Sequence, residues 1–213
     1  MRDRLPSPPM LMLAPLALLL RFLRLSLDPG VGPEARTDEE LFSAYVAGDR
    51  QAYAELWSRY APALCRLMRK QIRVPEDVND LVQQTFLQLH RARHDFREGA
   101  LLRPWLYTIA LNLRREYWRR RARRRESPAE LDERMLPTVH QADLVVKENA
   151  IAVRKALSTL PSGQREVIEL HWFEGFSFPE VAQIVGASLS AVKVRAHRGY
   201  KVLRAELQTA GVR

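Results

Sequence analysis

Hydrophobic residues recur at steps of three and four positions through most of the chain after residue 36, and no stretch shows the alternation typical of a strand. In the first half, this pattern predicts four helices, near residues 38–47, 50–67, 75–89 and 105–125. In the second half it predicts four more, near residues 151–160, 162–172, 178–185 and 189–207. The sequence therefore predicts an all-α protein.

Capping residues support the first of these boundaries. Thr37 and Glu40 have the spacing of a capping box, in which each side chain accepts a hydrogen bond from the other's backbone. The first helix is expected to end near Gly48, and Asp49 can cap the second. Pro75 suits the first turn of the third helix.

The third predicted helix has two different faces. Apolar residues form its buried face, and short polar groups lie opposite. Such groups suit a protein partner, and a face that is merely solvated is the alternative. The polar residues are Asp77, Asp80, Gln83, Gln84 and Gln88.

The fourth predicted helix is apolar in its first part and strongly basic in its second. Eight arginines between residues 113 and 125 oppose one acid, Glu116. Arginine contacts phosphates, whereas aromatic rings stack on unpaired bases, so this segment suits a partly single-stranded nucleic acid. The alternative is that most of the aromatic rings belong to the core. They are Trp105, Tyr107, Tyr117 and Trp118.

The segment FSFPEVAQIVGASLSAVKVRAHRG has the spacing of a DNA-binding helix-turn-helix over residues 178–198. Ala182 permits close approach of the two helices, Gly186 permits the turn, and Val192 fills the corner. Ser188 can cap the second helix. Its inward side is expected to include Leu189, Val192, Ala196, Tyr200, Leu203 and Leu207. Its outward side is expected to carry Ser190, Lys193, His197, Lys201 and Arg204, flanked by Arg195 and Arg198. A plain helical hairpin is the alternative.

Charge divides the chain into modules. The 213 residues hold 34 Lys and Arg against 25 Asp and Glu, a net charge of +9 that indicates a polyanionic partner, either nucleic acid or an acidic membrane surface. Most of the excess lies in the arginine-rich segment, whereas residues 126–148 hold six acids and two bases. We therefore expect two small helical domains joined by a flexible acidic linker.

No constellation points to an enzyme, a cofactor or a metal site. Cys65 is the only thiol, so an intrachain disulfide and a zinc site of paired cysteines are excluded, and its apolar neighbours suggest a core position. His90 and His94 are four residues apart without a third ligand, and are expected on a solvated helix face. The chain also lacks a glycine-rich phosphate loop, and we expect no small-molecule substrate.

Residues 1–36 differ in composition from the helical part of the chain. Arg2 and Arg4 precede an apolar run over residues 10–20, as in a signal peptide, but no cleavage site follows and Pro15 divides the run. The run is also shorter than the roughly 20 residues that span a bilayer. An unstructured extension is the preferred interpretation, and an interfacial amphipathic segment is the alternative.

Three motifs together resemble one protein family. They are DVNDLVQQTFLQLHRA (77–92), RPWLYTIALNLRREYWRR (103–120) and the stretch from residue 160 to residue 207 that contains the helix-turn-helix. In this order and spacing the chain resembles the small two-domain sigma factors of bacterial RNA polymerase, the extracytoplasmic-function (ECF) type of the sigma-70 superfamily. The match runs from about Asp38 to Leu207.

The resemblance implies a cytoplasmic, monomeric initiation factor that binds core RNA polymerase and promoter DNA. Residues 37–125 would be sigma region 2, 126–148 the linker and 149–213 sigma region 4. Asp80, Gln83 and Gln84 would contact the clamp of the largest polymerase subunit. The family more often has glutamate at Gln84 and tryptophan at His90, which suggests softer docking. An anti-sigma factor is a further partner of many members.

The resemblance also assigns two DNA-binding surfaces. The loop 95–103 and the helix after it would hold the melted minus-ten element, with contacts from Phe96, Arg97, Trp105, Asn112, Arg115, Arg119 and Arg120. Glu116 stands where the family usually has aspartate. The second helix of the helix-turn-helix would read the minus-thirty-five element, through Ser190, Lys193, Arg195, His197 and Arg198. Ser190 and Ala191 replace a common Gly-Thr pair, so the base sequence read is not inferred.

Two other classes of protein remain open from the sequence. A helix-turn-helix regulator that acts without polymerase would not need the first module, and it would usually dimerise on paired half-sites. A membrane-surface protein would use residues 10–27 and the arginine run.

Overall fold

The computed structural model describes residues 36–97, 99–123 and 144–210, with side chains from residue 151 onward in the last range. Every regular element in these ranges is helical, as the periodicity predicts. The expected extension, apart from Arg36, lies outside the described residues, and so do residues 126–143 of the expected linker. The chain divides into two compact units.

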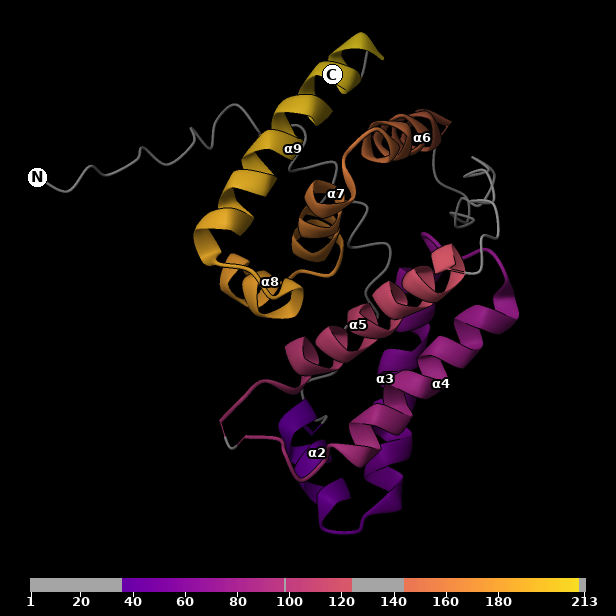
Figure 1. Ribbon diagram of the computed structural model, residues 1–213, viewed down its shortest axis with the longest axis vertical. Helices are drawn as coiled ribbons and strands as arrows, with labels where there is room; N and C mark the ends of the chain where they lie inside the picture. The colour runs from indigo at the N-terminus through magenta and orange to yellow at the C-terminus, as the bar shows by residue number, and fades with distance from the viewer. Residues whose placement is uncertain (1–35, 98, 124–143, 211–213) are drawn as a thin grey trace, which may run out of the picture. The chain divides into compact units, whose positions relative to one another are not determined.

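The first unit contains four helices, in which α3 packs against both α2 and α4, and α4 packs against α5 (Figure 1). Within this unit, the largest fully buried side chains come from all four helices and the turn after α3, so they form one core. The helices are α2 (Asp38–Val46), α3 (Arg50–Arg69), α4 (Pro75–Arg91) and α5 (Leu102–Arg123). The large core residues include Phe42, Leu56, Leu64, Met68, Ile72, Phe86, Leu89 and Tyr107.

Both predicted caps are confirmed. The Thr37 N–H donates to Glu40 Oε2 at 2.7 Å, and the Glu40 N–H donates to Thr37 Oγ1 at 3.2 Å. The hydrogen bond from the Thr37 backbone lowers the pKa of Glu40. Asp49 Oδ1 accepts from the N–H groups of Gln51 and Ala52 at 2.8 and 3.2 Å, after Gly48 has turned the chain with a φ of 108°. These local contacts separate α2 from α3 at the predicted position.

Helix α5 begins at Leu102, three residues before the predicted start. The Leu102 N–H donates to Glu39 Oε1 on α2 at 2.9 Å, so a side chain distant in sequence satisfies one of the unpaired donors of this helix end. Pro104 is tolerated inside the first turn because the N–H that it lacks would have no partner within the helix.

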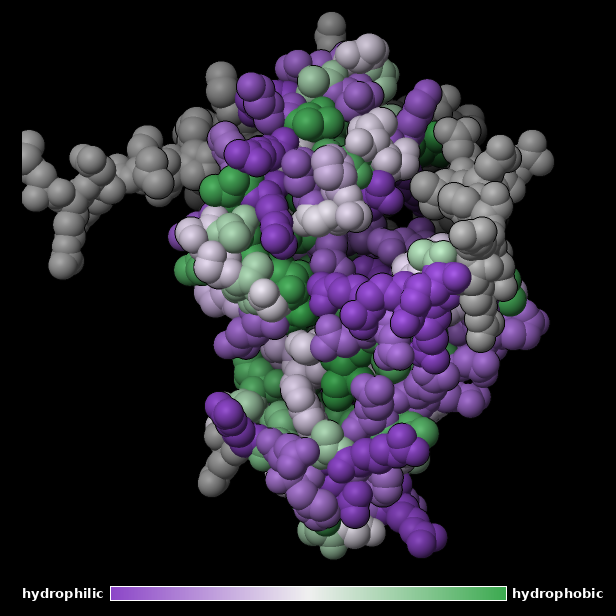
Figure 2. Space-filling model, viewed as in Figure 1, coloured by the Kyte–Doolittle hydropathy of each residue, from purple (hydrophilic) through white to green (hydrophobic). Residues whose placement is uncertain are grey.

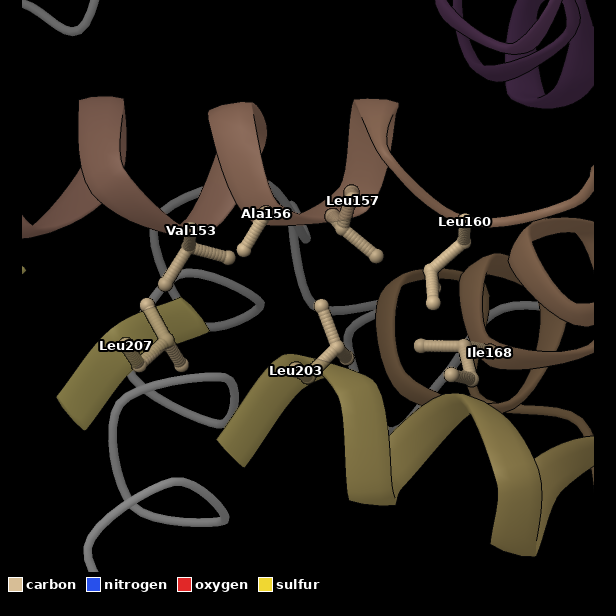
Figure 3. Close-up of a cluster of buried hydrophobic side chains, with 7 residues drawn as sticks. All are labelled: Val153, Ala156, Leu157, Leu160, Ile168, Leu203 and Leu207. Carbon is tan, nitrogen blue, oxygen red and sulfur yellow. The ribbon is translucent and has the colours of Figure 1, made fainter. Parts of the chain in front are cut away.

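The second unit is built around α9 (Leu189–Thr209), which packs against α6 (Leu144–Ser158) and α7 (Ser162–Ile168). A π-helical turn, η2 (Glu169–Phe173), extends α7, and α8 (Phe178–Val185) precedes α9. Figure 3 shows side chains of α6 and α9 pointing toward one another, with Ile168 of α7 beside them. The cluster comprises Val153, Ala156, Leu157, Leu160, Ile168, Leu203 and Leu207.

Helix α6 starts earlier than the periodicity indicated. Its first five residues, 144–148, belong to the segment predicted as linker. Among the residues of α6 whose side chains the structure describes, the apolar stripe that faces α9 begins at Val153.

The turn of the helix-turn-helix has the predicted construction. Gly186 has a φ of 67°, in the left-handed region that favours glycine, and the Ala187 N–H donates to the Ala182 carbonyl at 3.0 Å. Ser188 Oγ then accepts from the Ala191 N–H at 3.2 Å and caps α9. A local sequence signal therefore sets the relation between α8 and α9.

Replacing Gly186 with alanine should lower the free energy of unfolding by about 1–2 kcal/mol, because a Cβ disfavours the left-handed backbone. Apart from the adjacent residues, no atom of the described part of the chain lies within 4 Å of the position that this Cβ would occupy, so the cost comes from the backbone. Urea unfolding followed by circular dichroism measures the change. Gly163→Ala is the matched control, since Gly163 has equally open surroundings without a positive φ, and its stability should be unchanged or slightly higher. Equal losses in both variants would contradict the prediction.

Candidate nucleic-acid interface

Helix α9 exposes one face and buries the other. Ser190, Lys193, His197 and Arg198 are exposed, as predicted, whereas Arg195 is half-buried at the flank. The opposite side is buried through Val192, Ala196, Gly199, Leu203 and Leu207. The expectation that Leu189 faces inward is wrong: it is 39% exposed, because it is the first residue of the helix and lies ahead of the buried stripe. The outward face thus carries hydroxyl, imidazole and cationic groups that can reach a groove of DNA.

Two contacts on the buried side hold α9 in place. At Gly199, a Cβ atom would lie 2.5 Å from Ile168 Cδ1, so α9 approaches α7 closely, and a larger residue at this position would require the end of the Ile168 side chain to shift. One residue later, the Trp172 indole N–H donates to the Tyr200 hydroxyl at 2.7 Å. Burial raises the pKa of Tyr200 to about 12, so its hydroxyl stays protonated at neutral pH. Sequence reasoning placed Tyr200 on the inward face but gave no role to Gly199, a buried glycine in the middle of a helix.

The segment before α8 is also anchored locally. Ser177 and Glu180 form a capping box, with the Ser177 N–H and hydroxyl donating to Glu180 Oε2 at 2.7 and 2.6 Å. The His171 ring stacks on Phe178 with centroids 4.3 Å apart, and its Nδ1 lies 2.7 Å from the Phe176 carbonyl. The Ser-x-x-Glu spacing of the capping box was readable from the sequence, although the interpretation above did not use it.

The arginines of α5 divide into exposed and internal groups. Arg119 and Arg120 are exposed, and Figure 2 shows hydrophilic side chains gathered over the C-terminal half of α5. Arg120 lies 3.6 Å from the Glu116 carboxylate. An exposed ion pair of this kind contributes little stability, so Arg120 remains available to a phosphate. By contrast, Arg114 is only 3% exposed, and Arg121 Nη1 donates to the Tyr117 hydroxyl at 2.9 Å. Arg124 and Arg125 lie outside the described residues.

Asn112 lies just before this basic half, and Arg115 lies within it. Arg115 Nη1 donates to Asn112 Oδ1 at 3.0 Å, so the two predicted contacts are brought together on α5. Asn112 is exposed and Arg115 is half-buried. Its hydrogen bond orients the amide of Asn112, whose NH₂ group remains a donor toward solvent.

The aromatic residues predicted to stack on bases mostly pack on one another. Phe96 and Trp105 are half-buried, and their ring centroids lie 5.1 Å apart. The Phe42 ring of α2 meets Phe96 edge-on at 5.0 Å and Trp105 at 5.8 Å. These contacts fasten the loop before α5 to α2, and the adjacent Arg97 remains exposed. Part of the Phe96 ring and part of the Trp105 ring therefore belong to the core, as the alternative interpretation expected, and the rest of each ring is exposed.

Tyr117 links α5 to α4. Its hydroxyl donates to Asp77 Oδ2 at 2.8 Å, and burial, followed by the hydrogen bond to Asp77, raises the pKa of this hydroxyl. Asp77 is consequently half-buried and engaged within the unit. The other four polar residues predicted on this face, Asp80, Gln83, Gln84 and Gln88, are exposed.

Leu87 is a surface residue of α4 that the sequence interpretation missed. It is 45% exposed and follows Asp80, Gln83 and Gln84 by seven, four and three positions, so it lies among them on one helix face. Its signal in the sequence was an apolar residue out of phase with the buried stripe. The face therefore has an apolar centre with a polar surround, which is the composition of a protein-binding surface.

The remaining candidate groups do not assemble into a site. Within the described ranges, no three His, Cys, Asp or Glu side chains are placed to hold a metal ion. Cys65 is half-buried and not a core residue, because it faces a shallow surface hollow beside Trp57 and Pro62. His90 contacts the Tyr45 hydroxyl through Nδ1, and His94 lies in the turn after α4 rather than on a helix.

None of the helices in the described part of the chain has both the length and the apolar character required to cross a bilayer.

Comparison with known proteins agrees with this arrangement. Residues 56–124 match the Sigma-70 region 2 family model, and residues 150–203 match the Sigma-70 region 4 model. The chain is 35% identical over 167 residues to the ECF RNA polymerase sigma factor SigM of Mycobacterium tuberculosis. The aligned residues cover 78% of this chain and 83% of SigM. It is 34% identical to the RNA polymerase sigma factor CnrH of Cupriavidus metallidurans, covering 80% and 94% of the two chains.

Solved structures show the same fold. The structure of CnrH in complex with the cytosolic domain of CnrY matches with a TM-score of 0.60 and 32% identity, over 81% of this chain and 97% of that one. The sigma factor RpoE, solved with the anti-sigma factor NepR from Bartonella quintana, matches with a TM-score of 0.60 and 27% identity, over 73% and 96%. With both regions present in order and more than 30% identity over most of the chain, the resemblance seen in the motifs is confirmed. The chain belongs to the ECF family of RNA polymerase sigma factors.

Proposed function

We propose that this sigma factor binds core RNA polymerase through the exposed face of α4 and directs initiation by contacting promoter DNA through α5 and α9. In this proposal residues 37–125 act as region 2, residues 149–213 act as region 4, and residues 126–148 join them. The observation that carries the proposal is that α4, α5 and α9 each bury one side in a core and expose a polar side. Helices α4 and α5 lie in the part of the chain that matches region 2, and α9 lies in the part that matches region 4.

Polymerase docking would use a mixed surface. Leu87 supplies apolar area at the centre, and the surrounding carboxylate and amide groups of Asp80, Gln83 and Gln84 supply directional hydrogen bonds. The clamp of the largest polymerase subunit is the partner proposed for this surface. Asp77 would act through Tyr117, by fixing the relation of the docking helix to α5, rather than by touching polymerase.

DNA binding would divide between the two units. Arg119 and Arg120 would neutralise phosphates of the melted minus-ten element, and Asn112 would present a directional donor just before the basic half of the helix. The outward face of α9 would enter the major groove of the minus-thirty-five element, which remains duplex. Separate units suit this task because one element is single-stranded and the other is double-stranded.

An anti-sigma factor is proposed as a regulatory partner. RpoE was solved in complex with the anti-sigma factor NepR, and CnrH in complex with the cytosolic domain of CnrY. Transcription in vitro from purified core polymerase and a promoter pool tests the function as a whole. Promoter-specific transcripts that require this chain are expected, and DNA binding without any transcript would instead support a regulator that acts without polymerase docking.

Leu87→Ala should weaken binding to core polymerase by roughly 5- to 30-fold, equivalent to about 1–2 kcal/mol, because it removes apolar area from the centre of the docking face. Fluorescence titration of the labelled chain with core polymerase measures the affinity. Leu101→Ala is the control, since Leu101 is also an exposed leucine of this unit but lies outside α4. If both variants bind core as the parent chain does, α4 is not the docking face.

Arg119→Ala together with Arg120→Ala should lower holoenzyme affinity for all promoters alike, since arginines on phosphates read no sequence. The slope of log affinity against log salt should flatten by roughly 0.7–0.9 for each lost contact. The matched control replaces Arg66 and Arg69, two exposed arginines of α3, and should leave the slope unchanged. A loss confined to one promoter base would show that the α5 arginines read sequence instead.

Lys193→Ala and Arg198→Ala should each lower the use of promoters that depend on the minus-thirty-five element, by roughly 5- to 150-fold if one base contact is lost. Single-base promoter variants in transcription assays locate the base involved, because the variant chain should no longer discriminate at that position. Core binding should be unaffected, as the docking face belongs to the other unit. Equal losses across the whole panel would leave phosphate contact as the role of these residues.

A further inference from the structure

Val194 is an apolar residue at the centre of a polar helix face. Its side chain is 48% exposed on α9. At about 100° per residue, it lies roughly opposite the middle of the stripe formed by Val192, Ala196 and Leu203, which are all buried. Val194 therefore points away from the core of its unit.

The neighbours of Val194 are the groups already placed at the DNA surface. Ser190 precedes it by one turn and Arg198 follows it by one turn, while Lys193 and His197 lie on the same outward face. All four are exposed. A groove that receives these side chains must also receive the valine between them.

Helix stability does not explain a valine at this position. Branching at Cβ restricts its rotamers, so valine favours a helix less than alanine, lysine or glutamine would at an exposed site. Its two methyl groups make no hydrogen bonds, and with half of its surface exposed it contributes little to the core. What valine offers is a compact apolar surface held on a rigid backbone.

The major groove of DNA displays one apolar group, the 5-methyl group of thymine. The other base edges in that groove present hydrogen-bond donors and acceptors, which suit Ser190, Lys193 and Arg198 and do not suit valine. Contact between a valine methyl and a thymine methyl would bury apolar surface on both partners.

We propose that Val194 is a specificity-determining residue that contacts the 5-methyl group of a thymine in the duplex promoter element bound by α9. The assignment rests on the proposed function, because it requires α9 in the major groove. It adds to the polar contacts a preference for a thymine at the base pair that faces the middle of the helix.

Removal of the thymine methyl tests this contact directly. Holoenzyme made from core polymerase and the full chain first selects duplexes from a pool randomised over the upstream element. Each thymine of the preferred duplex is then replaced singly by deoxyuridine, which changes no hydrogen-bonding group. One replacement should lower affinity roughly fourfold, the effect of exposing one methyl-sized apolar group.

The same replacement should have no effect on holoenzyme that carries Val194→Ala, because the partner of the methyl is then gone. Val202→Ala is the matched control: Val202 is a 36% exposed valine two turns further along α9, and this variant should retain the full fourfold penalty. Both substitutions are on an exposed helix face, and equal thermal unfolding of the two variants and the parent excludes a folding effect.

Each outcome has a separate meaning. A preferred duplex without any methyl-dependent position, or a penalty that persists in Val194→Ala, would overturn the role of Val194 and leave the sigma-factor function standing. If the pool yields no preferred duplex although the chain binds core polymerase, the proposed reading of duplex DNA by α9 fails, and the inference fails with it.

Discussion

Burial of one face of a helix while the opposite face stays in solvent is the constraint on which this molecule depends. In the second unit α9 approaches α7 closely at Gly199, where an added Cβ atom would displace the end of the Ile168 side chain. Burial of the whole stripe of α9, from Val192 to Leu207, sets the rotation of the helix about its own axis, and that rotation decides which side chains face outward. Ser190, Lys193, Val194 and Arg198 therefore owe their exposure to contacts on the far side of the helix.

Polar contacts complete the positioning that burial begins. Two contacts connect η2 to the helix-turn-helix. Trp172 donates a hydrogen bond to Tyr200 of α9, and the His171 ring stacks on Phe178 of α8. In the first unit, Asp77, Tyr117 and Arg121 connect the start of α4 to the basic half of α5. Because these bonds lie partly away from solvent, they hold the proposed docking and DNA-binding helices in a defined relation within that unit.

Residues of one chemical type therefore serve two purposes. Among the arginines of α5, Arg114 is buried and Arg121 is bonded to Tyr117, whereas Arg119 and Arg120 face solvent. The aromatic side chains divide in the same way, since Phe96 and Trp105 each pack part of their surface against Phe42. A basic or aromatic cluster in a sequence thus overstates the number of groups that can reach a nucleic acid.

The sequence by itself determined the helical class, the capping of α2 and α3 at Thr37 and Asp49, and the Gly186 turn, because each depends on neighbours a few positions away. Periodicity also predicted most of the outward face of α9. Only the tertiary structure decided that Glu39 holds the start of α5 and that Asp77 is engaged by Tyr117. Those outcomes depend on which side chains of distant helices meet, and the spacing of residues along one helix carries no information about the surface of its partner.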